Sequence, residues 1–538
     1  MPISILNGLR AGLILCATAL VTTAMAADTG TVHAPGGANR GTYFDYMKTV
    51  YAHAGLPFLI QVPITAFDSN YQLHGLAAES WEQSGDQLTW TFHLRDGLSY
   101  TDGTPLTAHD YVFALQRAAS QGYDFGWYWS GAGVVNWAGV ESGALPPEDL
   151  GVSAPDDLTL NITTSAPRPF LPSVVSLLFP VPRHVVEKLG DDYALNADTI
   201  PATGPFRIES WDRGSNVVTY ARNESYTGPW TANVDRVITD PSVSSPEVAL
   251  PAFMAGEVDF TILNAGQIPF AQQRFPDQIR FNAVFATSYL AFDPEIAPFD
   301  NPLVRQAFYY AIDREELTQT VLRNLAIPAG SILPPNFPGY DEGVAGQAVF
   351  DPERAKALLA EAGYPGGEGF PEIEVYFRVQ GGYNGVISAP MLQYLQAQFA
   401  ETLGVHMELR LMPLPDWQQA MADRTNGLFL APYEADYIDP SNFYGLFHEG
   451  GRHHYDVASY DALVDEADAE SDWDKRVKLY ADAEQVLIDE ALIVPLVHPV
   501  QMYVVNQRLS GPSVEANAIG MTPMDQQRTY FYTHVKAE

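Results

Sequence analysis

Apolar residues recur along the chain with two different periods, and each period predicts a type of secondary structure. Segment 87–97, QLTWTFHLRDG, has an apolar side chain at every second position, namely Leu88, Trp90, Phe92 and Leu94. Side chains of a strand point alternately to its two faces, so this segment is predicted to be a half-buried strand that ends at a turn glycine.

The next segment has the period of an amphipathic helix and a capping signal at its start. Thr107 and Asp110 have the spacing of a capping box, and the apolar positions Val112, Leu115 and Ala119 follow at intervals of three and four residues. This pattern predicts a helix that begins just after Thr107.

Further helices are expected in the second half of the chain. Asn301 and Asp351 each precede a proline at the first helical position, and Gly363 is a stop signal for the second of these helices. Segment 471–497 predicts a long helix followed by a short apolar strand. Strand and helix signals alternate throughout, so the fold class is expected to be mixed α/β, without an internal repeat.

The N-terminus has the features of a cleaved signal peptide over residues 1–26. Arg10 precedes the apolar run 11–21, and Ala24-Met25-Ala26 has the A-x-A pattern of a signal-peptidase cleavage site. The run is shorter than the ~20 residues of a spanning helix. The mature protein is therefore expected to be soluble and outside the cytoplasm. The single cysteine, Cys16, lies inside the signal, so no disulfide is expected.

Composition and charge narrow the class of partner. The chain has 538 residues, of which 46% are hydrophobic and 17% are charged, a balance typical of a globular protein with several domains. Without the signal, 28 basic residues stand against 65 acidic residues, a net charge of −37. Such a charge repels nucleic acid and anionic membranes, so neither is an expected partner. The negative charge is expected to keep the protein soluble. The alternative role is electrostatic steering of cationic ligands to the protein.

Common catalytic motifs are absent from the sequence. There is no G-x-S-x-G elbow, no H-E-x-x-H, no P-loop and no glycine-rich dinucleotide fingerprint. His448, His453 and His454 with Asp456 form the one histidine cluster, but their spacing matches no standard zinc site. We therefore expect no enzyme activity, no cofactor and no metal site. A secreted hydrolase with paired carboxylates is the remote alternative.

Five longer segments, in order along the chain, resemble the family 5 extracellular solute-binding proteins, the dipeptide, oligopeptide and nickel binders of ABC importers. Together they extend over nearly the whole mature chain. The segments are 76–117, 203–226, 299–317, 351–367 and 435–443.

The resemblance implies a type 2 periplasmic binding protein fold of cluster C, with two lobes around a hinge and an additional inserted domain. Its lobes would close over a ligand, and a monomer would deliver this ligand to a permease and ATPase complex in the inner membrane. Hinge crossings are expected near Phe292 and Val505. The implied parts are domain I in 27–69, 193–292 and 506–538, domain II in 70–192, and domain III in 293–505.

The resemblance also implies a peptide ligand and a set of site residues. Asp436 matches the aspartate that pairs with the ligand's α-ammonium group, and the alternative is a turn cap or an internal ion pair. Trp417 matches an aromatic residue that lines a pocket for a ligand side chain, and the alternative is that it belongs to the hydrophobic core. Arg424 matches an arginine near the ligand or makes an internal ion pair. Tyr433 would form part of the wall beside Asp436, and Glu434 could favour a second cationic group.

Some features depart from the pattern or allow other ligands. Segment 426–436 is shorter than its counterpart and lacks an arginine, which leaves ligand length and recognition of the carboxylate end open. Asp439, before a proline, is expected to form a turn. Trp127, Trp129 and Trp137 could stack on sugar rings or fill a core. An oligosaccharide, an opine-like compound or a metal chelate is therefore the alternative ligand.

Overall fold

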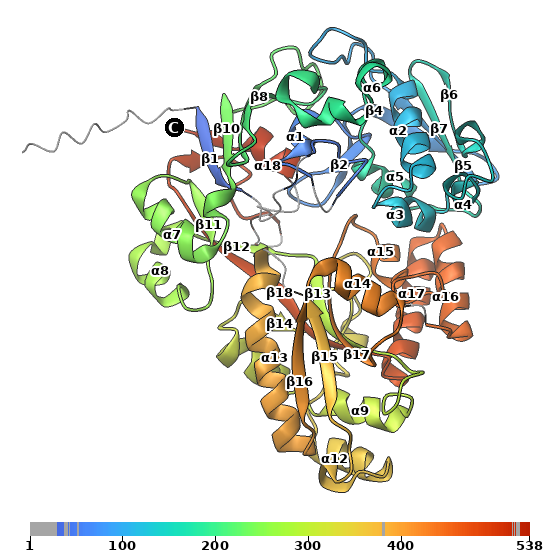
Figure 1. The fold of residues 1–538 in the computed structure, drawn as a ribbon, viewed down its shortest axis with the longest axis vertical. Helices are drawn as coiled ribbons and strands as arrows, with labels where there is room; N and C mark the ends of the chain where they lie inside the picture. The colour runs from blue at the N-terminus through green and yellow to red at the C-terminus, as the bar shows by residue number, and fades with distance from the viewer. Residues whose placement is uncertain are drawn as a thin grey trace, which may run out of the picture.

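The computed structural model describes residues 30–36, 41, 43–50, 53–378, 382–453, 455–518, 520, 522 and 528–538. The predicted signal peptide, residues 1–26, lies outside the described residues. Mixed α/β structure is confirmed, with an upper lobe of two four-stranded sheets above a lower lobe built around a larger sheet (Figure 1). Within the described part of the chain, no helix combines the length and the apolar character needed to cross a membrane.

The upper lobe contains two separate sheets. The first has the order β1-β10-β9-β8, with β1 and β10 parallel and the other pairs antiparallel. Its strands are β1 (Thr31–Pro35), β8 (Phe206–Asp212), β9 (Val217–Arg222) and β10 (Arg236–Asp240). The second is antiparallel with the order β4-β5-β7-β6. Its strands are β4 (Ala78–Gln83), β5 (Thr89–Leu94), β6 (Val152–Asp156) and β7 (Thr159–Thr163).

Helices surround the second sheet and carry the aromatic-rich segment. They are α2 (Ala108–Ser120), α3 (Gly126–Gly131), α4 (Trp137–Glu141), α5 (Leu171–Val174) and α6 (Arg183–Leu189). Trp129 and Trp137 are buried in the core that these helices share with the sheet, whereas Trp127 is 45% exposed. Two of the three tryptophans are therefore core residues.

The lower lobe is built on an eight-stranded sheet of order β11-β18-β13-β17-β15-β16, with β12 and β14 also paired to β18. The strands are β11 (Phe260–Ile262), β12 (Ile279–Ala283), β13 (Ala286–Phe292), β14 (Ala326–Pro328), β15 (Ile373–Arg378), β16 (Met407–Met412), β17 (Leu428–Glu434) and β18 (Ile493–Val505). One face packs against α9 (Pro302–Tyr310), α12 (Pro352–Glu361) and α13 (Gly382–Leu403). The other packs against α14 (Leu414–Ala422), α15 (Ser441–Tyr444), α16 (Ala458–Ala469) and α17 (Trp473–Asp489).

Strand β18 is much longer than the short strand predicted. Its first half pairs with β13 and β14, and from Val500 onward it pairs with β12 and β11. The partner strands β12 and β13 are separated only by Val284 and Phe285. The point at which β18 changes partners therefore lies opposite the short break between β12 and β13. The predicted domain boundaries and hinge crossings stay predictions.

The capping signals correspond to observed helix starts. Asp110 accepts hydrogen bonds from the backbone and hydroxyl of Thr107, so the capping box of α2 is confirmed. Asn301 caps α9 and Asp351 caps α12 through side-chain oxygens. The apolar pattern after Asn301 continues past the end of α9, because Asp313 caps a new helical turn. Predicted strand 87–97 is confirmed as β5.

Candidate functional site

The candidate site lies at the edge of the large sheet that faces the upper lobe. Strands β15 and β17 run parallel, so their carboxyl ends meet at this edge, the side of a parallel sheet where ligands commonly bind. Asp436 lies two residues after the end of β17, and Tyr437 next to it packs into the hydrophobic core of the upper lobe. Figure 1 shows α15 next to α3 and α5 across the boundary between the lobes.

Asp436 is half-buried between the two lobes. Its carboxylate accepts a hydrogen bond of 2.8 Å from the Tyr433 hydroxyl, and its backbone N–H donates to Asn442 Oδ1 at 2.9 Å. Desolvation raises the pKa of Asp436, and the Tyr433 hydrogen bond and the positive charge of Arg452 only partly oppose this. Among the described residues, no Lys, Arg or His nitrogen lies within 4.0 Å of the Asp436 carboxylate, the distance limit for an ion pair. The carboxylate is therefore poorly compensated by the protein.

Tyr433 is the centre of the site. It lies near the end of β17, opposite Thr287 of β13, and its ring meets Phe443 edge to face at 5.4 Å. Its hydroxyl holds Asp436, and the guanidinium of Arg452 lies 4.9 Å from its ring centroid. This tyrosine is therefore in contact with one negative and one positive side chain.

Trp417 lies on α14 and is only 2% exposed. It packs edge to face on Phe429 at 6.1 Å, and the guanidinium of Arg378 lies 4.9 Å from its ring. Its indole N–H is buried without a hydrogen-bond acceptor in the described structure. Trp417 thus belongs to the core of the lower lobe, and Arg378 at the end of β15 lies over its ring.

Arg424 and Glu434 lie at opposite ends of β17. Arg424 donates two hydrogen bonds to Asp293 and pairs with Glu295 at 3.0 Å, and this ion pair raises its pKa. The seven residues of β17 separate it from Asp436, about 20 Å at ~3.3 Å per residue. Glu434 is half-buried at the near end of β17. The structure therefore brings Tyr433, Glu434 and Asp436 together and leaves Arg424 apart.

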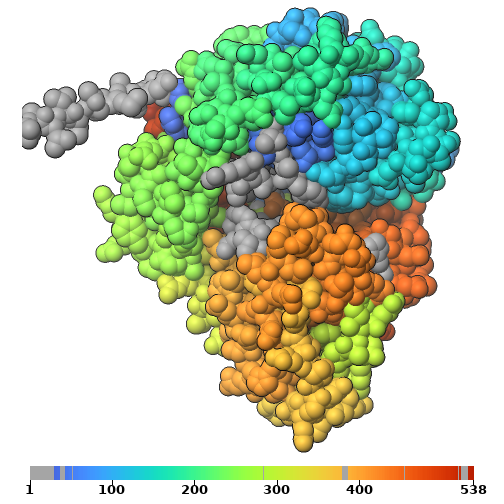
Figure 2. Space-filling view, in the orientation of Figure 1, coloured from blue at the N-terminus to red at the C-terminus, as the bar shows by residue number. Residues whose placement is uncertain are grey.

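The lobes also touch through residues that sequence reasoning missed. Tyr437 stacks parallel to Phe170 of the upper lobe at 6.0 Å, and the guanidinium of Arg476 lies 5.0 Å from the same Phe170 ring. Arg168 Nη1 lies 3.8 Å from Asp468 Oδ2. We call Arg168, Phe170, Tyr437, Asp468 and Arg476 the interlobe cluster. The cyan and orange-red surfaces meet on the right of the space-filling view (Figure 2), where α3 and α5 face α16 and α17.

Asp439 has the structural role that was predicted for it. Its carboxylate accepts hydrogen bonds from the backbone and hydroxyl of Ser441, which forms the expected turn. It also receives two hydrogen bonds of 2.8 and 2.6 Å from Arg476. This buried pair holds the segment after Asp436 against α17.

The two described histidines near residue 450, His448 and His453, contact different partners. His453 is buried and shares a hydrogen bond of 2.8 Å with the Tyr289 hydroxyl, while His448 faces Asp465 at 3.3 Å. His454 lies outside the described residues. Within the described ranges, no group of three or more histidine, cysteine, aspartate or glutamate side chains is placed to hold a metal ion.

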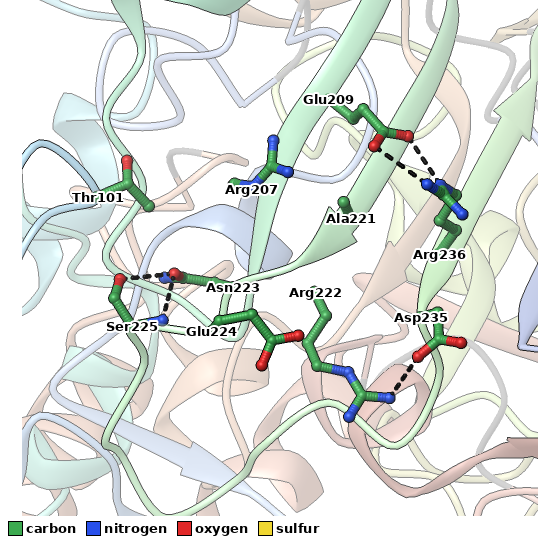
Figure 3. Close-up of a pocket in the computed structure, with 10 residues that line it drawn as sticks. All are labelled: Thr101, Arg207, Glu209, Ala221, Arg222, Asn223, Glu224, Ser225, Asp235 and Arg236. Atoms are coloured by element: carbon green, nitrogen blue, oxygen red, sulfur yellow. Dashed lines mark hydrogen bonds and ion pairs between the residues drawn. The ribbon is translucent and has the colours of Figure 1, made fainter.

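A cavity of about 510 Å³ lies elsewhere, on the first sheet of the upper lobe (Figure 3). Its lining includes two pairs of oppositely charged side chains. Arg236 binds Glu209 at 2.8 Å, and Arg222 binds Asp235 at 2.8 Å. Because these charges neutralise one another in an open hollow, the interlobe edge is the better candidate site.

Comparison with known proteins identifies the family. Residues 72–454 match the model described as bacterial extracellular solute-binding proteins, family 5 Middle. The chain is 30% identical over 451 residues to the probable deoxycholate-binding periplasmic protein YgiS of Escherichia coli, covering 80% of each chain. It is 29% identical over 471 residues to the periplasmic oligopeptide-binding protein OppA of Salmonella typhimurium, covering 83% of this chain and 82% of that protein.

The fold comparison agrees with the family match. The structure of Haemophilus influenzae OppA in complex with the peptide RPPGFSPFR superimposes with a TM-score of 0.76 over 95% of this chain and 99% of that one, at 23% identity. This confirms the expected type of fold. A match over most of the chain in sequence and in structure leads to one conclusion: the chain belongs to family 5 of the bacterial extracellular solute-binding proteins, a family of binding proteins rather than of enzymes.

Proposed function

We propose that this protein is the periplasmic substrate-binding component of an ABC importer, and that it captures peptides by their free amino end when its lobes close. The observation that carries the proposal is Asp436, a half-buried carboxylate at the interlobe edge with no ion-pair partner in the described part of the chain. The family membership and the peptide ligands of relatives named OppA support it.

The physical argument concerns the cost of a desolvated charge. A carboxylate in a closed and water-poor cleft is stabilised when a ligand brings an opposite charge. An α-ammonium group supplies this charge and can donate to the oxygen of Asp436 that Tyr433 leaves free. Losing one member of such a pair costs on the order of 2–5 kcal/mol, which corresponds to a ~30-fold or larger loss of affinity.

A second candidate ligand is an apolar carboxylate. The relative YgiS carries the name of a deoxycholate-binding protein, and the site here combines aromatic rings with two arginines. Arg378 stacks on Trp417 and Arg452 stacks on Tyr433. Such a ligand would use the arginines and leave Asp436 unpaired, so the two candidates differ in their dependence on Asp436.

Calorimetric titration of ligand-stripped protein tests the proposal. Peptides with free amino ends should bind at least ~30-fold more tightly than their N-acetylated forms, and Asp436→Asn should abolish this difference. Glu374→Gln is the matched control, because it neutralises a half-buried carboxylate near the start of β15, at the end of the sheet opposite to Asp436. Equal binding of free and acetylated peptides by the unmodified protein would remove Asp436 from this role. Deoxycholate binding that Asp436→Asn leaves unchanged would support the second candidate.

A further inference from the structure

We propose that Arg452 binds an anionic group of the ligand, so that Asp436 and Arg452, on either side of Tyr433, select ligands that carry both a positive and a negative charge. This inference rests on the proposed function, because it uses the same site. It adds a specificity-determining residue that neither the sequence motifs nor the family match indicated.

Arg452 is a half-buried cation in a strongly acidic chain. The chain has 65 acidic and 29 basic residues, and arginines such as Arg117, Arg424 and Arg476 each contact at least one carboxylate. Arg452 contacts the Tyr433 ring and donates to the Pro432 carbonyl oxygen at 3.4 Å. No carboxylate within the described ranges reaches the 4.0 Å of an ion pair with it.

The position of Arg452 is set by its buried neighbour. His453 lies in the core, where its backbone N–H donates to the Leu446 carbonyl oxygen at 3.1 Å and its imidazole stacks on Phe447 at 5.1 Å. Its Nε2 atom shares a hydrogen bond with the Tyr289 hydroxyl. Arg452 is therefore next to a residue that is anchored in the core, and preorganisation of this kind lowers the entropic cost of binding.

Tyr433 keeps the two charges apart. Its hydroxyl binds Asp436 while its ring face receives the Arg452 guanidinium. The positive charge of Arg452 lowers the pKa values of both Asp436 and Tyr433 against the larger effect of burial, so it acts within electrostatic range of both. The pair interacts through space but makes no ion pair, and each charge keeps capacity for a ligand group.

The charge balance of the site determines its preference. A site with one carboxylate alone favours any cation, whereas Arg452 repels a ligand that is only cationic and attracts one that also carries a carboxylate. A guanidinium has five N–H donors in a fork that matches a carboxylate, and the Pro432 carbonyl accepts one of them. The zwitterion of a peptide with a free amino end and a free carboxylate fits both charges.

Four probes and three variants test the inference. The probes are tri-alanine, its C-terminal amide, its N-acetyl form and sodium deoxycholate, titrated into ligand-stripped protein. Wild-type protein should prefer tri-alanine over the amide by ~10-fold or more, Arg452→Gln should reduce this preference to less than ~2-fold, and Arg452→Lys should retain part of it. Arg354→Gln is the matched control, because Arg354 also stacks on a tyrosine, at 4.0 Å from Tyr310, on the distant helix α12.

The outcomes separate this inference from the proposed function. If Arg452→Gln keeps the full preference for the free carboxylate, or if the wild-type protein binds none of the three carboxylate probes, the inference is overturned. If the wild-type protein binds deoxycholate but no peptide, the peptide function fails, and loss of deoxycholate binding in Arg452→Gln still supports an anion site. Thermal unfolding should show the same midpoint for Arg452→Gln and Arg354→Gln, which separates specificity from folding.

Discussion

The ion pair between Arg168 and Asp468 joins the lobes, so its removal should shift the protein toward an open state. Arg168 precedes α5 of the upper lobe, and Asp468 lies on α16 of the lower lobe. Their side chains are only 14% and 15% exposed, so salt screens this pair less than it screens a surface pair. The change Arg168→Gln leaves a shorter polar side chain and removes the charge.

The distance sets the size of the effect. At 3.8 Å and an effective dielectric constant of about 20, the attraction between two unit charges is about 4 kcal/mol. Desolvation of both groups and loss of side-chain freedom offset most of this, which leaves about 1–2 kcal/mol net. A change of that size alters the ratio of closed to open molecules by roughly 5- to 30-fold.

Small-angle X-ray scattering of ligand-free protein measures the shift. The radius of gyration should be larger for Arg168→Gln than for the wild type, and saturating ligand should make both compact. Ligand affinity should fall by about the same factor as the closed population, although Arg168 is not among the proposed ligand contacts. Arg183→Gln is the control, because Arg183 pairs with Glu187 on the exposed helix α6 of the same lobe.

Identical scattering profiles for Arg168→Gln, Arg183→Gln and wild type would refute this reasoning. The same would follow if Arg168→Gln weakened ligand binding without any change in compactness, because the residue would then act on the ligand and not on closure. Increasing salt should not reproduce the effect, since the pair is shielded from solvent.

Three further predictions concern stability. Burial lowers the pKa of His498 to about 4, so the unfolded chain binds a proton first as the pH falls. The contribution of His498 to the free energy of unfolding should therefore decrease by about 3 kcal/mol between pH 6.5 and 4, and urea titrations measure it as the difference between the wild type and His498→Gln. Burial raises the pKa of Glu484 to about 7 against hydrogen bonds from Ile332, Ser331 and Tyr444, so the unfolded chain loses its proton first as the pH rises. The contribution of Glu484 to the free energy of unfolding should decrease by about 3 kcal/mol between pH 4.5 and 7, opposite in sign to that of His498. The difference between the wild type and Glu484→Gln isolates it, and a difference that does not change with pH would contradict the assignment. Removing the buried Arg476 of the Asp439 pair by Arg476→Ala should cost about 3–5 kcal/mol in the same urea assay, and a cost below ~1 kcal/mol would contradict the pairing.

Local sequence signals predicted the elements well, because they depend on residues only a few positions apart. The capping box of Thr107 and Asp110 and the alternation in β5 were sufficient to locate one helix and one strand. Strand β18 shows the limit of such signals. It is buried along almost its whole length and exchanges partners midway, and even the polar residues at the exchange, His498 and Gln501, are buried. The pattern of apolar and polar residues therefore does not mark where one sheet region ends and the next begins.

For the site, local sequence and resemblance located Asp436, Tyr433 and Glu434 on one segment, since these residues follow one another at the end of a strand. The role of Arg452 depends on tertiary structure. It lies sixteen positions after Asp436 and nineteen after Tyr433, and only the path of the intervening chain brings its guanidinium over the Tyr433 ring. The resemblance implied that Arg424 lies near the ligand. In the structure, the length of β17 places Arg424 at the far end of the strand, where it pairs with Asp293.

The sequence by itself determined the element types, the family and the acidic surface, because periodicity, caps and composition are properties of neighbouring residues or of the chain as a whole. Only the tertiary structure decided which charges meet. Arg168 and Asp468 are 300 positions apart, and Arg452 finds the ring of Tyr433 rather than a carboxylate. Electrostatic and desolvation energies depend on distance and burial in space, and neither is encoded in the order of residues.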